Sequence, residues 1–293
     1  MIERDRRRIV VGVDGSAGGV EAARWAAGEA RLHRRQVQLV CVYSWPALVP
    51  LAQLPSQWTE ESLRAGAEAA AANAVAVVRA AAPEVGVTSV ALPGLAAYTL
   101  IEMSSGTSMV VVGHRGHGGF AALRLGAVAA KVAAYAQSPV VVVRPGAGDR
   151  ALSPAIVLVG ADGSPASEAA VGVAFEEADR RGGEVRALHS WELSVLPWRG
   201  EVWPPLPDHT EVEAAVQRRL HQWIQPWQDK HPRVTVEQRV TGTRPAAALI
   251  EAASDATLLV VGSRGHGGFA GLLLGSVSQQ VIHHAPCPVV VVR

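Results

Sequence analysis

The stretch Gly113-His-Arg-Gly-His-Gly-Gly-Phe-Ala-Ala-Leu-Arg-Leu-Gly126 recurs near the end of the chain as Gly262-Ser-Arg-Gly-His-Gly-Gly-Phe-Ala-Gly-Leu-Leu-Leu-Gly275, with eleven of fourteen positions identical. Three further pairs recur in the same order, at offsets of 146 to 149 residues: Ile9–Ser16 with Val157–Ser164, Ser44-Trp45 with Ser190-Trp191, and Pro139–Arg144 with Pro288–Arg293. A repeat of this length indicates duplication of a whole domain. We therefore expect domains at residues 1–145 and 151–293, joined by the Pro- and Gly-rich segment 145–150.

Each copy alternates short apolar strands with helical segments. In the first copy, continuous runs of mostly β-branched residues occupy 9–13, 37–42, 109–112 and 140–143. Such runs are typical of a parallel sheet that is covered on both faces. Helix signals lie between them, including Ser16 before an Ala-rich stretch and Thr59-Glu-Glu-Ser before another. The sequence predicts an α/β protein of two tandem doubly wound domains, each a five-stranded parallel sheet with helices on both faces.

The composition excludes several classes of protein. A hydrophobic fraction of 49% and a charged fraction of 18% in 293 residues rule out an intrinsically disordered chain. The 27 basic and 26 acidic side chains leave a net charge of +1, so no overall field favours a nucleic acid or a membrane surface. Residues 1–8 lack the apolar segment of a signal peptide, and polar residues interrupt the Ala-rich stretch 65–82. Because Cys41 and Cys287 lie in apolar runs typical of a reducing compartment, we expect a cytoplasmic protein without nucleic-acid or membrane partners.

Glycine-rich loops follow the strands of both copies, at the edge of a parallel sheet where ligands bind. In the first copy the candidate nucleotide-binding residues are Gly12, Asp14, Val42, Gly113, Arg115, Gly116, His117, Gly118, Gly119, Gly126, Ala127 and Val128. In the second copy they are Gly160, Asp162, Leu188, Gly262, Arg264, Gly265, His266, Gly267, Gly268, Gly275, Ser276 and Val277. Each copy therefore carries a candidate site of its own.

The residue types in these loops suit a phosphate group, which needs backbone N–H groups directed at it and no Cβ in the way. Glycine permits the close approach, and a helix N-terminus adds free N–H groups and a partial positive charge. Arg115 and Arg264 can add charge-assisted bonds, and Ser276 fits a helix N-cap whose hydroxyl donates to a phosphate oxygen. Asp14 and Asp162 can hold a ribose hydroxyl or a phosphate-bound Mg²⁺.

The pattern Gly-x2-Gly-x9-Gly-[Ser/Thr] after a Val-Val-Gly strand, together with an N-terminal Val-Gly-Val-Asp-Gly-Ser, resembles the universal stress protein family. The resemblance is to members with tandem domains and covers essentially the whole chain. It implies a five-stranded parallel sheet per domain, ATP bound at the Gly-rich loops and a regulatory role in stress. It also implies that the final strands, 140–143 and 289–292, meet and join the domains as a pseudo-dimer. The first copy departs from the motif, because Ala127 replaces Ser/Thr and removes one hydroxyl contact to phosphate.

Other interpretations of these residues are weaker. No Gly-Lys-[Ser/Thr] follows the glycines as in a Walker A loop, and the Gly-rich stretch follows the fourth strand, unlike a dinucleotide fingerprint. The histidines at 114, 117 and 283–284 lack the further ligands of a zinc site. Ser16 and Ser164 fit helix caps rather than nucleophiles, because no elbow motif surrounds them.

Tryptophans form two groups outside the motif. The segment 191–203, with its counterpart 45–58, fits a lid or partner surface as well as it fits a packed connection. Trp223 and Trp227 are four residues apart on an expected helix, which favours packing against the core.

The leading hypothesis is an ATP-binding, non-catalytic regulator with up to two nucleotides per chain, with Mg²⁺ as an optional companion of the phosphates. One alternative is a slow ATPase or nucleotidyl-transfer enzyme of the same architecture. Another is an interaction hub in which ATP is only a conformational ligand. No paired general acid and base lies near the loops in the sequence, which weighs against efficient hydrolysis. Further association into a homodimer stays open.

Overall fold

The computed structural model describes residues 8–45, 59–117, 125–146, 155–191, 209–266 and 273–293. In the first repeat the elements are β1 (Arg8–Val13), α1 (Ala17–His33), β2 (Gln36–Tyr43), α2 (Glu60–Ala81), β3 (Val87–Pro93), α3 (Ala96–Ser104), β4 (Met109–Gly113), α4 (Ala127–Tyr135) and β5 (Val140–Val143). In the second they are β6 (Ile156–Gly160), α5 (Pro165–Arg181), β7 (Glu184–Ser190), α6 (His209–Lys230), β8 (Thr235–Thr241), α7 (Pro245–Ala252), β9 (Leu258–Gly262), α8 (Ser276–His284) and β10 (Val289–Val292). The predicted alternation of strands and helices is confirmed in both repeats.

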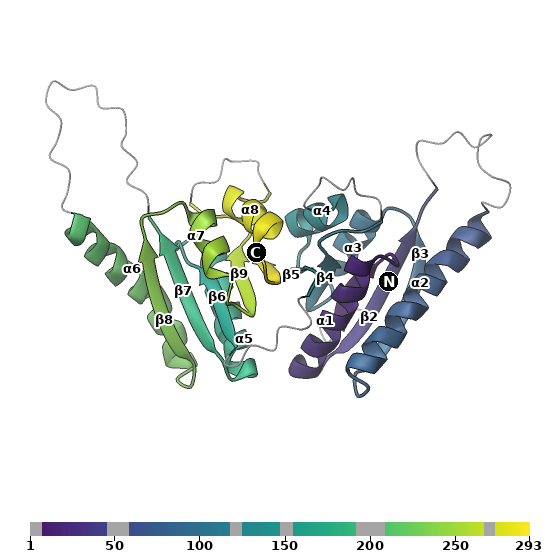
Figure 1. Ribbon diagram of the computed structural model, residues 1–293, viewed down its shortest axis with the longest axis horizontal. Coiled ribbons are helices and arrows are strands. Elements are labelled where there is room, and N and C mark those ends of the chain that lie inside the picture. The colour runs from purple at the N-terminus through teal and green to yellow at the C-terminus, as the bar shows by residue number, and fades with distance from the viewer. Residues whose placement is uncertain (1–7, 46–58, 118–124, 147–154, 192–208, 267–272) are drawn as a thin grey trace, which may run out of the picture.

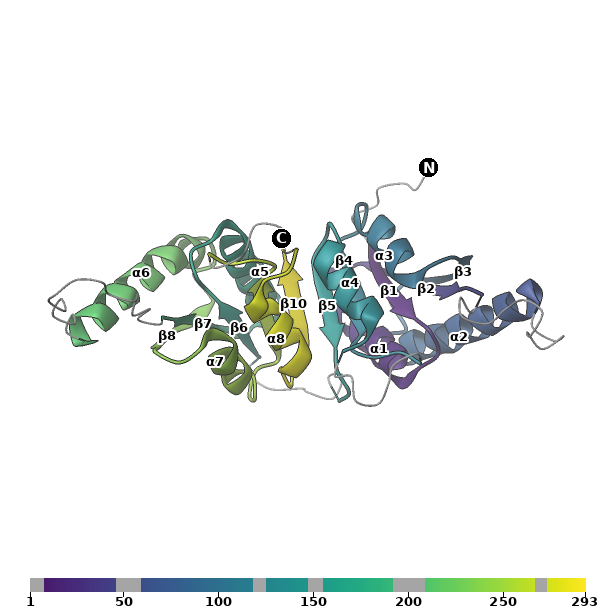
Figure 2. The same ribbon diagram turned by 90° about the horizontal axis from the view of Figure 1, so that it is seen from above.

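These strands form one continuous sheet with the order β3-β2-β1-β4-β5-β10-β9-β6-β7-β8. Neighbouring strands within each repeat are parallel, which confirms the predicted five-stranded parallel sheets. The final strands β5 and β10 pair antiparallel, with Val141 opposite Val290, and lie side by side between the two halves (Figure 2). This pairing removes two apolar edges at once, so the expected pseudo-dimer within one chain is confirmed.

Helices cover both faces of the sheet. On one face α1, α2, α5 and α6 pack around a core that includes the fully buried Ile9, Leu39 and Phe175. On the other face α3, α4, α7 and α8 enclose a second core that includes Leu100 and Leu259. The long helices α2 and α6 lie on the outer flanks of the molecule (Figure 1). The doubly wound arrangement therefore holds in each half.

The helix ends follow the local sequence signals. Ser16 and Ser164 are the N-caps of α1 and α5, and each hydroxyl accepts a hydrogen bond from a backbone N–H three residues later. At the other end of α1, Arg34 adopts a left-handed conformation with φ of 51°. Trp223 and Trp227 pack against the first core, as their spacing on α6 predicts. Among the described helices, none is both long enough and apolar enough to cross a membrane.

Candidate functional site

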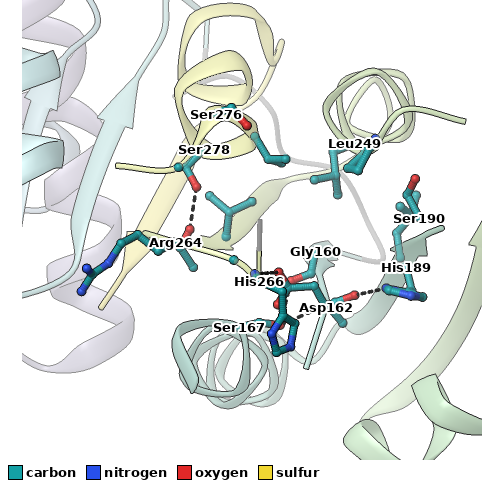
Figure 3. A pocket seen from close by; sticks show the side chains of 18 residues that line it. Gly160, Asp162, Ser167, His189, Ser190, Leu249, Arg264, His266, Ser276 and Ser278 are labelled. Carbon is teal, nitrogen blue, oxygen red and sulfur yellow. Dashed lines mark hydrogen bonds between the residues drawn. The ribbon is translucent and has the colours of Figure 1, made fainter. Parts of the chain in front are cut away.

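Each half has a cavity at the carboxyl ends of its strands. The second-domain pocket measures about 460 Å³ and is lined from β6, β7 and β9 and from the first turns of α5, α7 and α8 (Figure 3). The first-domain pocket measures about 250 Å³ and lies at the ends of β1, β2 and β4, beside the starts of α3 and α4. Both cavities are therefore where a doubly wound sheet places its ligands.

An aspartate after the first strand ties together the two loops of each pocket. Asp162 Oδ1 accepts hydrogen bonds from the backbone N–H of Ser164 at 3.0 Å and from its hydroxyl at 2.6 Å. Asp162 Oδ2 accepts the backbone N–H of His266 at 3.2 Å. Asp14 makes the three equivalent bonds, at 3.0, 2.5 and 3.0 Å. Each carboxylate thus holds the Gly-rich loop against the start of the neighbouring helix.

The same carboxylates explain the second glycine of the motif. A Cβ placed on Gly265 would lie 2.2 Å from Asp162 Oδ2, and one on Gly116 would lie 2.2 Å from Asp14 Oδ2. Real Cβ atoms do not approach other heavy atoms so closely, so a larger residue would push the loop off the carboxylate. Glycine is needed here for space rather than for a left-handed backbone, because neither residue has a positive φ.

The helices α4 and α8 begin at the pockets with open N-termini. Gly126 and Gly275 are their N-caps, and within the described part of the chain no side chain caps either helix. The predicted N-cap role of Ser276 is therefore wrong: Gly275 has the extended backbone of an N-cap, and Ser276 is the first helical residue. An uncapped helix start leaves its first N–H groups available to an anion.

Hydroxyl groups distinguish the two pockets at this helix start. Ser276 and Ser278 line the second-domain pocket, and the Ser278 hydroxyl donates to the carbonyl of Gly262 at 2.6 Å. Ala127 and Ala129 line the equivalent part of the first-domain pocket. The first-domain pocket is therefore both smaller and poorer in hydroxyl donors.

The two arginines of the loops behave differently from the expectation of simple phosphate contacts. The Arg264 side chain points away from the second-domain cavity, and its backbone carbonyl accepts the Ser164 hydroxyl at 3.3 Å (Figure 3). Arg115 lines the first-domain pocket, and its buried Nε has no hydrogen-bond partner among the residues that the structure describes. A buried donor of this kind usually finds a ligand or a water.

His189 is a pocket residue that the sequence analysis missed. Its Nδ1 lies 2.6 Å from the carbonyl oxygen of Ala161, and its ring meets the edge of Trp223 (Figure 3 shows the first contact). Burial lowers the pKa of His189, so the ring is neutral near pH 7. Because the carbonyl can only accept, Nδ1 is the donor and Nε2 is left as an acceptor. The equivalent residue of the first half is Tyr43, which does not line its pocket.

The structure brings most of the predicted site residues together. Those lining the first-domain pocket are Gly12, Asp14, Val42, Gly113, Arg115, Gly116, Gly126, Ala127 and Val128. Those lining the second-domain pocket are Gly160, Asp162, Leu188, Gly262, Arg264, Gly265, His266, Gly275, Ser276 and Val277. His117 does not line its pocket, and its backbone N–H instead donates to Asp14. Gly118, Gly119, Gly267 and Gly268 lie outside the described residues, as do most of the two Trp-containing segments.

Other pocket residues carry no polar signal in the sequence. Leu100 on α3 and Leu249 on α7 form an apolar wall of their respective pockets. From the sequence, a leucine in a helix is predicted to pack in the core. Only the folded chain shows that these two leucines also face a cavity. His114 follows β4 but lines neither of the two pockets; burial lowers its pKa, and the nearby Arg144 and Arg115 lower it further.

The comparisons with known proteins agree with this architecture. The universal stress protein family model matches residues 5–144 and 155–293. A universal stress protein of Mycolicibacterium smegmatis is 41% identical, and the alignment covers 97% of this chain and 96% of the relative. One from Mycobacterium tuberculosis strain H37Rv is 36% identical over 99% of this chain and 98% of the relative. A crystal structure of a universal stress protein from Archaeoglobus fulgidus shares the fold, with a TM-score of 0.73 at 20% identity and coverage of 100% and 98%. With both halves matched and whole-length relatives of the same kind, the chain belongs to the universal stress protein family and is a member with two tandem domains.

Proposed function

We propose that this chain binds ATP and acts as a non-catalytic regulator in the stress response of the cytoplasm. One observation carries the proposal: the second-domain pocket combines a Gly-rich loop, the open N-terminus of α8 and a cavity of about 460 Å³. That volume lies within the range of small-molecule sites. Backbone N–H groups at an uncapped helix start favour a phosphate over an uncharged group.

The walls of the second-domain pocket fit the other parts of an adenine nucleotide. Leu188, Leu249 and Val261 offer an apolar surface to a flat base. Asp162 lies in the same lining, and its two oxygens already accept three hydrogen bonds. A carboxylate has about four acceptor positions, so one remains for a ribose hydroxyl or for Mg²⁺ on the phosphates.

The first-domain pocket supports weaker binding of the same ligand. It has Ala127 where the second has Ser276, and a volume of about 250 Å³. Arg115 also lines this pocket, so its guanidinium is the positively charged group nearest to a phosphate there. We therefore infer up to two nucleotides per chain, with the second domain as the tighter site.

A binding role fits the chemistry of the pocket better than catalysis does. Asp162 is committed to holding the loops, so it is a poor general base. The alternative is a slow ATPase or nucleotidyl-transfer enzyme. Its general base would be His189, which lines the pocket and whose Nε2 is an acceptor. Efficient phosphoryl transfer also needs a positioned nucleophile and charge stabilisation of the transferred group. We therefore expect turnover far below the usual enzyme range of about 1–1000 per second.

The proposal is tested by identifying what the full chain binds. Protein purified under native conditions is denatured, the released small molecules are identified by mass spectrometry, and the emptied protein is titrated with ATP by calorimetry. We expect an adenine nucleotide in the released fraction and a titration that fits two unequal sites. A released fraction without nucleotide, together with no heat of binding for ATP, would show that the proposed function is wrong.

A further inference from the structure

A cluster of charged side chains lies between the two domains, away from both pockets. Glu29 and His33 come from the last turns of α1, and Glu177 and Arg181 come from the last turns of α5. The four side chains are 4–7% exposed. The members correspond in pairs through the repeat, since Glu29 matches Glu177 and His33 matches Arg181 at an offset of 148 residues. We call these four residues the interdomain quartet.

The quartet alternates acid and base across the domain boundary. His33 Nε2 lies 3.0 Å from Glu177 Oε1 in the other domain and 3.4 Å from Glu29 Oε2 in its own. Arg181 takes the remaining oxygen of each carboxylate, Oε1 of Glu29 and Oε2 of Glu177. Every base therefore contacts both acids, and two of the four contacts join the domains.

The charge balance of the quartet depends on a proton. With His33 protonated, two carboxylates face an imidazolium and a guanidinium, and the buried charges cancel. With His33 neutral, one buried carboxylate charge is uncompensated, which is costly in a desolvated position. Glu29 Oε2 is the oxygen most affected, because it is buried and, like both ring nitrogens of His33, has no well-directed hydrogen bond among the described residues.

A proton fits this position better than a metal ion does. Glu29, His33 and Glu177 could in principle offer three ligands to a cation. Arg181 already binds one oxygen of each carboxylate, so a divalent ion would leave a buried excess of positive charge. The neighbouring ionic groups are Arg35, Glu176 and Arg180 at the rim of the same site. Arg180 pairs with Glu176 at 3.1 Å and also lies 3.6 Å from Glu177 Oε1, and its partly exposed side chain is screened by solvent.

We propose that the interdomain quartet is a pH-dependent latch that holds α1 against α5 while His33 is protonated and loosens when His33 loses its proton. The N-caps of α1 and α5 are Ser16 and Ser164, which Asp14 and Asp162 hold beside the pockets. The latch therefore joins the far ends of the two helices whose near ends form part of the pockets. Opening or closing the latch therefore changes how tightly the two domains are held together, and no pocket residue needs to change.

The direction of the pH effect follows from the two titrating groups. Burial alone lowers the pKa of His33, but its bonds to Glu177 and Glu29 and their charges outweigh burial and raise the pKa above 6.5. Burial alone raises the pKa of Glu177, but His33 and Arg181 lower it to about 2. A raised histidine pKa contributes stability that is complete below pH 6.5 and is lost as the pH rises through the folded value. The latch therefore opens on the alkaline side.

Two variants of the full chain separate the states of the latch. His33→Gln removes the proton site and mimics the open state at every pH, whereas His33→Arg matches Arg181 and keeps a charge at every pH. His221→Gln, an exposed histidine of α6, is the matched control. Thermal unfolding of all four proteins is followed between pH 6.5 and about 9, where the carboxylates stay ionised and the histidines other than His33 are common to wild type and the His33 variants. Hydrogen exchange of residues 27–33 and 175–181 reports on the contact directly.

We expect the midpoint of wild type and His221→Gln to fall by about 2–4 °C more than that of His33→Gln over this range. We also expect exchange at the ends of α1 and α5 to accelerate with pH in wild type but not in His33→Gln. If His33→Arg folds, it should lack the pH dependence and remain protected. Equal slopes in wild type and His33→Gln, by both measurements, would overturn the proposal even if His33→Arg does not fold. Loss of the wild-type pH dependence on chelation would overturn it too, because the cation would then be a metal.

Discussion

Replacing Gly265 by alanine gives the sharpest test of how the second-domain site is built. The added Cβ would lie 2.2 Å from Asp162 Oδ2, against an ordinary contact of 3.4 Å or more. The loop must therefore move off the carboxylate by about 1.2 Å. That movement breaks the hydrogen bond from the backbone N–H of His266, which now measures 3.2 Å. The lost hydrogen bond is a strong one, because its acceptor is a charged carboxylate.

A hydrogen bond to a charged group contributes about 1.5–3 kcal/mol. If the loop must return to its place for ATP to bind, affinity falls by roughly tenfold to a hundredfold. Calorimetric titration of the full chain with ATP measures the change. Gly66→Ala is the matched control, because a Cβ at this helical position meets nothing within 4 Å. If Gly265→Ala binds ATP as tightly as Gly66→Ala, with unchanged unfolding, the contact between loop and carboxylate does not build the site.

Three further outcomes are expected from the same pockets. Ser276→Ala removes one hydroxyl donor, so calorimetry should show ATP binding to the second domain weakened by roughly threefold to tenfold. Ala127→Ser should strengthen binding to the first domain. Unchanged affinity in both variants would show that this hydroxyl does not contribute to ATP binding. Asp162→Ala leaves the backbone N–H groups of Ser164 and His266 without their acceptor, so the unfolding midpoint in urea and the ATP affinity should both fall, and a change in only one would separate the structural role from ligand binding. Phosphate release from ATP should stay well below about one per second, and a faster rate that is lost in His189→Gln would favour the enzyme alternative.

Local signals in the sequence were sufficient for the fold. The repeat of Gly113–Gly126 at Gly262–Gly275 fixes the number of domains, because a duplicated motif implies a duplicated fold. Continuous valine runs such as 140–143 are typical of strands in a sheet that helices cover on both faces. The glycines of the loops were predictable for a similar reason, since their spacing follows a strand and precedes a helix. The identity of the cap at α8 was wrong, because Gly275 and Ser276 both fit a helix start and differ by one residue.

Tertiary structure decided the features that depend on distant residues meeting. Gly265 and Asp162 are over a hundred residues apart, so the close approach that requires glycine cannot be read from either loop alone. In the sequence His189 is only a residue near the end of a strand. The structure shows that its Nδ1 contacts the Ala161 carbonyl and that the ring lines the pocket. The interdomain quartet is the clearest case. Each half of the sequence shows only an acid and a base one helical turn apart on a surface helix, and the antiparallel pairing of β5 with β10 is what turns both pairs inward and makes one buried, charge-balanced cluster of them.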